Sequence, residues 1–253
     1  MKENTKKILL WLFAAELNNK QSAAGSVSTD IFQKLLPDLT RSGLRSLVRL
    51  MEEKQLLVID DSGTGQRLML TNYGRERLEA EFLVVKRITE PWTGLWTQIL
   101  FLNGPSSDPH FRNLRSLLLR NQAFSLKRGV YLYPGKLPYE AAEVIKKEYL
   151  NTAAVVELGQ WCCCEELIVI GQVLHLHDRI DVYSGISEES AALLRKKQKT
   201  KMLTDQQKSK ICSIFDRLYQ TLENDRGVLQ HYFPQAVSGV DLLIDLTSLT
   251  AAL

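Results

Sequence analysis

The spacing of apolar residues changes from a helical to a strand pattern within residues 39–71, and this change constrains the fold of the chain most strongly. A helical stripe occupies residues 41–54 and consists of Leu44, Leu47, Val48 and Met51. Two short apolar segments, 56–60 and 66–71, follow on either side of the turn DSGTG, which is typical of a β-hairpin. A helix that leads directly into a hairpin predicts a small α+β domain.

The segments around this helix predict three more helices and their capping residues. An apolar periodic segment covers about residues 5–18, and Ser28 or Thr29 is placed to cap a short second helix. Thr40 is placed to cap the third helix, and a fourth helix follows the hairpin. The order of these elements is that of a winged helix-turn-helix, and we assign this domain to residues 1–83.

One face of the third helix carries side chains that suit DNA. When its apolar stripe is buried, Arg41, Arg45 and Arg49 must face outward together with two serines. The second helix of a helix-turn-helix enters the major groove, where arginine pairs with guanine or contacts phosphates. The hairpin is placed to touch the DNA backbone or the minor groove. We predict that double-stranded DNA contacts Thr40, Arg41, Ser42, Arg45, Ser46, Arg49, Thr64, Gln66 and Arg67.

Two other interpretations of this face stay open. Arginines at helical spacing also suit a solvated surface, and winged helices also serve in protein or RNA assembly. The formal net charge of +3 gives no general attraction to polyanions, so DNA binding would depend on this local cluster.

Residues 91–183 are expected to form a second domain with a different order of elements. The continuous apolar run GLWTQILFL predicts a buried strand, and a leucine-rich amphipathic helix follows it. Two short strands turning at Lys127–Gly129, another helix and the strand TAAVVEL complete the order β-α-β-β-α-β. This is the order of a ferredoxin-like fold, whose sheet leaves a free surface on which we expect two copies of the chain to pair.

The remaining sequence predicts more strands and then helices. We expect the apolar residues at 161–183 to form further strands, with the cysteine triplet 162–164 entering a buried one. A helix capped by Ser187 and a longer helix at about 205–224 follow. We therefore assign residues 184–253 to a C-terminal, mostly helical region whose role the sequence does not give.

Several motifs in the second domain together carry a family resemblance. They are Trp92-x-Gly94-x-Trp96, Arg112-x-x-Arg115, Ala123-Phe124-x-Leu126 and Gly129-Val130-Tyr131-Leu132-Tyr133-Pro134. This part of the chain resembles the central domain of PaaX-type transcriptional regulators, whose best-known members repress phenylacetate catabolism. That family combines an N-terminal winged helix, a ferredoxin-like domain related to the small CRISPR adaptation nuclease, and a C-terminal helical region. The matching domain order covers about residues 5–160.

The resemblance implies a function as well as a fold. It implies a sequence-specific transcriptional regulator, a dimeric repressor that binds an inverted-repeat operator. It also implies a small-molecule effector, which is an acyl-coenzyme A thioester in the best-known members. This chain has Ala123 where glycine is common, and its C-terminal segment HYFPQAVSGVDLLIDL lacks the usual tryptophan. The chemistry of any effector therefore stays open.

The relationship to a nuclease raises a second function, a metal-dependent phosphodiesterase. Nucleases of that type resemble one another in placing an aspartate at the end of the first strand, because magnesium needs a carboxylate ligand. Here the strand ends at Asn103, and Asp108 reaches that position only if its loop folds back. His175 and His177 would share one face of an extended segment, but no third ligand is placed beside them. We expect no catalytic site, no metal site and no cofactor.

The apolar segments and the cysteines of the chain bear on its cellular compartment. No apolar segment is long enough to span a bilayer, and we expect no membrane partner. The start, MKENTKKILLWLFAAELNNK, resembles a signal peptide superficially, but Glu16 interrupts its apolar run. The cysteines at 162–164 lack the spacing of a zinc site, and with Cys212 they indicate reduced thiols. We therefore expect a cytoplasmic protein.

Overall fold

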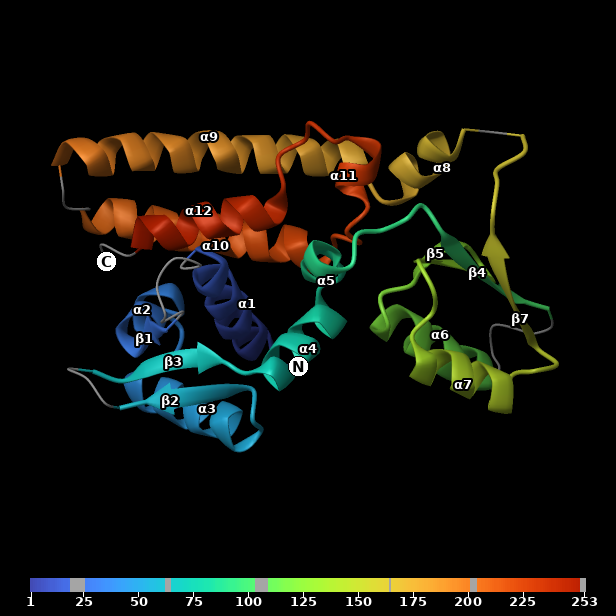
Figure 1. Cartoon of the computed structure of the whole chain (residues 1–253), viewed down its shortest axis with the longest axis horizontal. Helices are drawn as coiled ribbons and strands as arrows, with labels where there is room; N and C mark the ends of the chain where they lie inside the picture. Colours follow the sequence, from blue (N-terminus) through green and yellow to red (C-terminus); the bar gives the residue numbers. More distant parts are fainter. Residues whose placement is uncertain (19–25, 62–64, 103–108, 164, 201–203, 251–253) are drawn as a thin grey trace. The chain divides into compact units, whose positions relative to one another are not determined.

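The structure, a computed structural model, describes residues 1–18, 26–61, 65–102, 109–163, 165–200 and 204–250 (Figure 1). It has the mixed α+β architecture expected from the sequence, with one three-stranded and one four-stranded antiparallel sheet. The chain folds into two compact units. The terminal unit comprises Met1–Val85, Asp178–Asp225 and Gln235–Leu253, and the central unit comprises Lys86–His177 and Arg226–Pro234.

This division differs from the three consecutive domains expected from the sequence. The chain first passes from the terminal to the central unit within α5 (Leu83–Thr89), close to the expected boundary. The expected C-terminal region at 184–253 does not form a unit of its own, because most of it packs into the terminal unit. The short helix α11 (Leu229–Tyr232) belongs instead to the central unit.

Helix α1 (Glu3–Asn18) lies at the centre of the terminal unit. Every residue from Ile8 to Ala15 is buried, so this helix needs packing partners on all sides. It packs against α12 (Gly239–Thr250), α4 (Asn72–Glu81) and β3 (Arg67–Leu70). The C-terminal helix α12 therefore completes a core that the N-terminal elements cannot close alone.

The first half of the terminal unit contains the helices and the hairpin expected from the sequence. Helices α2 (Thr29–Leu35) and α3 (Arg41–Glu53) come first, and β2 (Leu57–Asp60) then pairs with β3. A strand that was not expected, β1 (Val27–Ser28), adds to this pair and gives the order β1-β3-β2. Of the two expected caps for α2, Ser28 is the one observed, since its hydroxyl accepts a backbone hydrogen bond of 3.3 Å.

Helix α4 approaches the preceding chain so closely that only glycine fits at position 74. A Cβ on Gly74 would lie 1.9 Å from the carbonyl oxygen of Leu56, and a backbone atom cannot give way cheaply. We predict that Gly74→Ala destabilises the protein by about 1–3 kcal/mol, although alanine is the better helix former. Urea unfolding followed by circular dichroism measures this change.

The matched control for this substitution is Gly185→Ala in α9 (Leu176–Thr200). A Cβ on Gly185 would meet nothing within 4 Å, so alanine should stabilise the protein by up to about 1 kcal/mol. Equal unfolding midpoints for the two variants would show that α4 moves away from Leu56 without cost.

The central unit contains the four-stranded sheet and two helices that lie on the same side of it (Figure 1). The sheet and these two helices are formed by β4 (Trp96–Phe101), α6 (Pro109–Arg120), β5 (Phe124–Lys127), β6 (Val130–Pro134), α7 (Tyr139–Glu148) and β7 (Ala153–Leu158). All neighbouring strands are antiparallel, in the order β5-β6-β4-β7. The order of elements along the chain is the β-α-β-β-α-β order expected from the sequence.

The prediction of further strands at residues 161–183 was wrong. These residues form α8 (Glu166–Val173) and the beginning of α9, and Ser187 lies inside α9 instead of capping a helix. A short apolar run does not by itself distinguish a buried strand from a buried helix. Here Ile170 and Leu174 are both buried, and their separation of four residues puts them on one face of a helix.

The cysteines before α8 also differ from the expectation of a buried strand. Cys162 and Cys163 are exposed, and Cys164 lies outside the described residues. Cys212 is half-buried, and burial raises the pKa of its thiol. The triplet therefore contributes no core in the part that the structure describes.

A buried ionic cluster joins the start of α9 to the residues after α10 (Asp205–Glu223). Nη1 of Arg179 lies 3.1 Å from Oδ1 of Asp225, and the hydroxyl of Tyr183 donates a 2.8 Å hydrogen bond to Oδ2. The Asp225 side chain is 1% exposed, and burial raises the pKa of Tyr183 well above its usual value. The chain crosses between the units four times, and two of these crossings, directly after His177 and directly after Asp225, are close to the cluster in the sequence.

Candidate nucleic-acid interface

The polar face of α3 is exposed, as its apolar spacing predicted. Leu44, Val48 and Met51 are buried at 5%, 1% and 1% exposure, while Leu47 is half-buried. This packing fixes the rotation of the helix and turns its other side to the solvent. The residues expected on that side are all exposed, namely Arg41, Ser42, Arg45, Ser46 and Arg49.

Thr40 has a structural role in this face. Its hydroxyl accepts a 3.1 Å hydrogen bond from the backbone amide of Gly43 and lies 3.1 Å from the hydroxyl of Ser42. The Thr40 side chain therefore caps α3, as expected, and the same capping contacts occupy the hydroxyl that was also expected to touch DNA.

We predict that Thr40→Ala lowers the free energy of unfolding by about 1 kcal/mol, because it removes the side-chain acceptor of the Gly43 amide in the first turn of α3. Thermal unfolding followed by circular dichroism measures the loss. Ser46→Ala, in the exposed middle of the same helix, is the control and should change the stability by less than about 0.5 kcal/mol. An equal effect of both substitutions would contradict the capping role.

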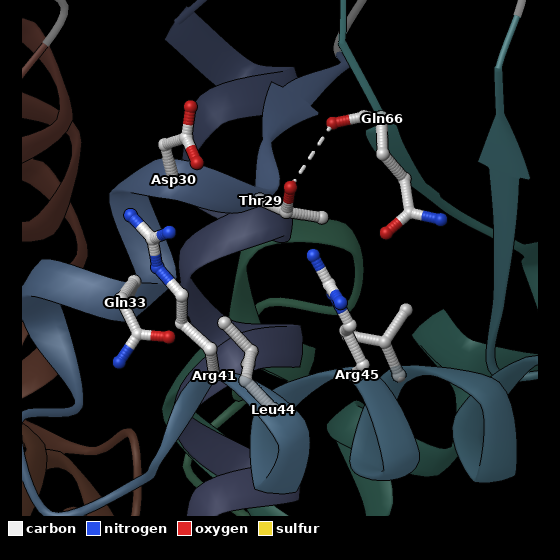
Figure 2. Close-up of a pocket in the computed structure, with 8 residues that line it drawn as sticks. Thr29, Asp30, Gln33, Arg41, Leu44, Arg45 and Gln66 are labelled. Atoms are coloured by element: carbon white, nitrogen blue, oxygen red, sulfur yellow. Dashed lines mark hydrogen bonds between the residues drawn. The ribbon is translucent and has the colours of Figure 1, made fainter.

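A small depression of about 150 Å³ lies between α2, α3 and the start of β3 (Figure 2). Figure 2 shows the side chains of Arg41 and Arg45 rising from α3, Arg41 on the side of Asp30 and Arg45 on the side of Gln66. The floor is apolar and is formed by Leu44 and its neighbour Val48. Two cationic side chains that converge on one recess can hold an anionic group or a base edge between them.

A backbone contact ties α2 to the hairpin at this depression. The carbonyl oxygen of Gln66 accepts hydrogen bonds from the amide of Thr29 at 3.1 Å and from its hydroxyl at 3.4 Å (Figure 2). No pattern in the sequence indicated that Thr29, Asp30 and Gln33 would line the recess, because their position depends on how α2 packs on α3.

The hairpin residues of the predicted site have different positions. Gln66 is half-buried and lines the same depression as the two arginines. Arg67 is exposed, and its backbone pairs with Ser28 on one side and Asp60 on the other. Thr64 lies outside the described residues. The structure thus brings the hairpin together with α3 through Gln66.

The three arginines of α3 have no acidic partner in the part of the chain that the structure describes. Elsewhere in the terminal unit, Arg217 pairs with Glu189 at 2.6 Å, and Arg75 pairs with Glu16. Guanidinium groups without a counter-charge are available for bidentate contacts with phosphate or guanine. Asp30 lines the recess on the side of Arg41 without forming an ion pair with it, so the two arginines of the recess outnumber its one carboxylate.

The alternative metal sites have no support from the described residues. His175 and His177 are both exposed at the junction of α8 and α9, where His175 has a φ of 51°, so the extended segment expected for them was wrong. No group of three His, Cys, Asp or Glu side chains in the described ranges could hold a metal ion. Asn103 and Asp108, the positions that bear on a nuclease site, lie outside those ranges.

Among the helices of the described segments, none is long and apolar enough to cross a membrane.

Comparison with known proteins identifies a similar fold. No family model matches this sequence, and no curated protein matches it. Among solved structures, the chain is similar to the uncharacterized protein Rv0674 from Mycobacterium tuberculosis, with a TM-score of 0.52 and 17% sequence identity. The match covers 94% of this chain and 92% of that protein. At this identity the similarity shows a shared fold alone.

Proposed function

We propose that this protein is a sequence-specific DNA-binding transcriptional regulator, with α3 as its recognition helix. The observation that carries the proposal is the exposed face of α3, on which Arg41, Arg45 and Arg49 have no acidic partner among the described residues. The order α2, α3, β2 and β3 supports a winged helix-turn-helix, in which the second helix of the motif enters the major groove. The recess beside Arg41 and Arg45 would then receive a phosphate or a base edge.

The central unit supports the second half of the proposal, a dimeric repressor. Its β-α-β-β-α-β order and the strand order β5-β6-β4-β7 favour a ferredoxin-like domain, which would pair two copies. Two recognition helices related by a two-fold axis would read an inverted repeat with half-sites about 34–36 Å apart. The PaaX-type motifs favour a repressor that works in the cytoplasm.

A gel-shift experiment tests the proposed function. The full chain is incubated with a labelled duplex that contains its own promoter, with and without magnesium or manganese. A discrete shift that persists with excess unrelated duplex, and that a scrambled promoter does not give, is the expected result. Ionic strength is held constant, because the affinity of any phosphate-contacting protein falls steeply with salt.

The other outcomes separate the alternative functions. Metal-dependent shortening of the duplex would favour a nuclease that uses the central unit. Neither a shift nor cleavage, for the promoter and for unrelated sequences, would exclude the regulator and favour a winged-helix protein that serves in protein or RNA assembly.

A further inference from the structure

A cavity of about 310 Å³ lies within the central unit, at the lower end of the size range of small-molecule sites. Its walls come from the last turn of α5, the loop that follows and the end of β6. The residues that matter for its chemistry are Lys86, Arg87, Trp92, Tyr133, Gly135 and Lys136. Trp92 and Tyr133 belong to motifs in which the DNA-binding proposal assigns no contact to either side chain.

The guanidinium group of Arg87 forms part of this cavity, and within the described residues it forms no ion pair; the Glu90 carboxylate acts on it electrostatically. In the same part of the chain, its hydrogen bonds go to the backbone carbonyl oxygens of Pro134 and, at 3.4 Å, Glu90. Its Nε is buried and has no hydrogen-bond partner within the described residues. Burial lowers the pKa of Arg87, and a bound anion would offset this cost of burying its charge.

The charge of the whole cavity is positive. Lys86, Arg87 and Lys136 are its cations, and Glu90 is its carboxylate. Glu90 is already paired with Lys86 at 3.2 Å. Lys136 is exposed and forms no ion pair in the described part of the chain. Three cations therefore share one carboxylate, which is paired with Lys86 and acts on Arg87 electrostatically, so the lining keeps an excess of positive charge.

Hydrogen bonds hold the rim of the cavity in place. Gly135 has a φ of 100°, and its amide donates a 2.7 Å hydrogen bond to the carbonyl oxygen of Leu95. The indole of Trp92 donates to the same oxygen at 2.7 Å, and the hydroxyl of Thr97 donates to the carbonyl oxygen of Gly135 at 2.7 Å. A Cβ on Gly135 would lie 3.5 Å from Nη2 of Arg87, so glycine keeps a side chain away from the guanidinium group.

We propose that this cavity binds a small oxyanion, a carboxylate or a phosphate group. The planar guanidinium of Arg87 matches the geometry of both groups, and Lys136 supplies a second cation at the mouth. The fixed backbone around Gly135 means that little ordering is needed on binding. This site does not depend on whether the protein binds DNA.

A chemical-shift titration of the full chain tests the site, with inorganic phosphate and benzoate as separate probes. The signals followed are the indole N–H of Trp92 and the amide of Gly135, at constant ionic strength. At least one probe should cause a saturable shift of these signals. The probe that does so shows whether the site binds a phosphate or a carboxylate group. Lys136→Gln should weaken its binding by about fivefold, and Arg87→Gln by about tenfold or more.

Lys146→Gln is the matched control, because Lys146 is exposed on α7 and the substitution removes the same charge from the same unit. It should leave the affinity unchanged. Arg87 also donates hydrogen bonds to the backbone, so circular dichroism must show that the Arg87→Gln variant is folded. If that variant is unfolded, the affinity of the Lys136→Gln variant alone tests the site. Either no saturable shift with both probes, or an equal effect of Lys136→Gln and Lys146→Gln, would overturn the site.

Discussion

Asp225→Ala is expected to destabilise the protein by about 3–5 kcal/mol, the largest effect that the structure predicts for a single side chain. Asp225 is 1% exposed and is the partner of both Arg179 and Tyr183. Its removal takes away the carboxylate that lies 3.1 Å from the guanidinium of Arg179, which is itself only 9% exposed. Breaking one half of a buried ion pair costs far more than the pair contributes.

Urea unfolding followed by circular dichroism and tryptophan fluorescence measures this loss. Asp181→Ala is the control, since Asp181 is an exposed carboxylate on the same helix α9, and it should change the stability by less than about 0.5 kcal/mol. Tyr183→Phe removes one hydrogen bond to Asp225 and should cost about 1 kcal/mol. Equal stability of the Asp225→Ala and Asp181→Ala variants would mean that Arg179 finds another partner when the carboxylate is removed.

On the proposed function, Arg45→Ala is expected to weaken operator binding by about 1–3 kcal/mol, roughly 5- to 150-fold in affinity. Arg45 lies in the middle of the exposed face of α3 and lines the recess that also contains Arg41 and Gln66. If its guanidinium pairs with a base, the substitution also lowers the preference for the operator over unrelated DNA. If it contacts a phosphate, the loss is uniform across sequences, and the slope of log affinity against log salt falls by about one.

The control for this prediction is Arg77→Ala on α4. Arg77 is an exposed arginine of the same unit, so the substitution removes the same charge away from α3. Binding isotherms at three or more salt concentrations, with operator and scrambled duplexes, separate the effects. A variant with Arg45→Ala that binds its operator as tightly as the wild type would remove α3 from the interface.

The sequence predicted the parts of the candidate site that depend on local interactions. Thr40 caps α3 because a hydroxyl at that position reaches the first-turn amides of any helix that begins there. The spacing of Leu44, Val48 and Met51 allows one rotation of the helix against a core, so the outward direction of Arg45 followed without knowledge of the fold.

Other parts of the site depended on packing between elements. Thr29 and Gln33 line the recess only because α2 lies against α3, and no residue pattern in one sequence gives that placement. Similarly, the cavity that contains Arg87 and Lys136 forms where the end of β6 passes the last turn of α5. The sequence identified Trp92 and Tyr133 as motif residues without showing that they share a cavity.

The sequence by itself determined the helices and the hairpin of the first 83 residues and the β-α-β-β-α-β order, because capping, turns and apolar spacing act over a few residues. Tertiary structure decided the features that depend on contacts between segments far apart in the sequence. Residues 166–173 and 176–183 became helical where an apolar run suited either form, and α12 packed against α1 to cover a helix whose residues 8–15 are all buried. Such choices depend on apolar area that distant segments bury together, a quantity that local sequence does not contain.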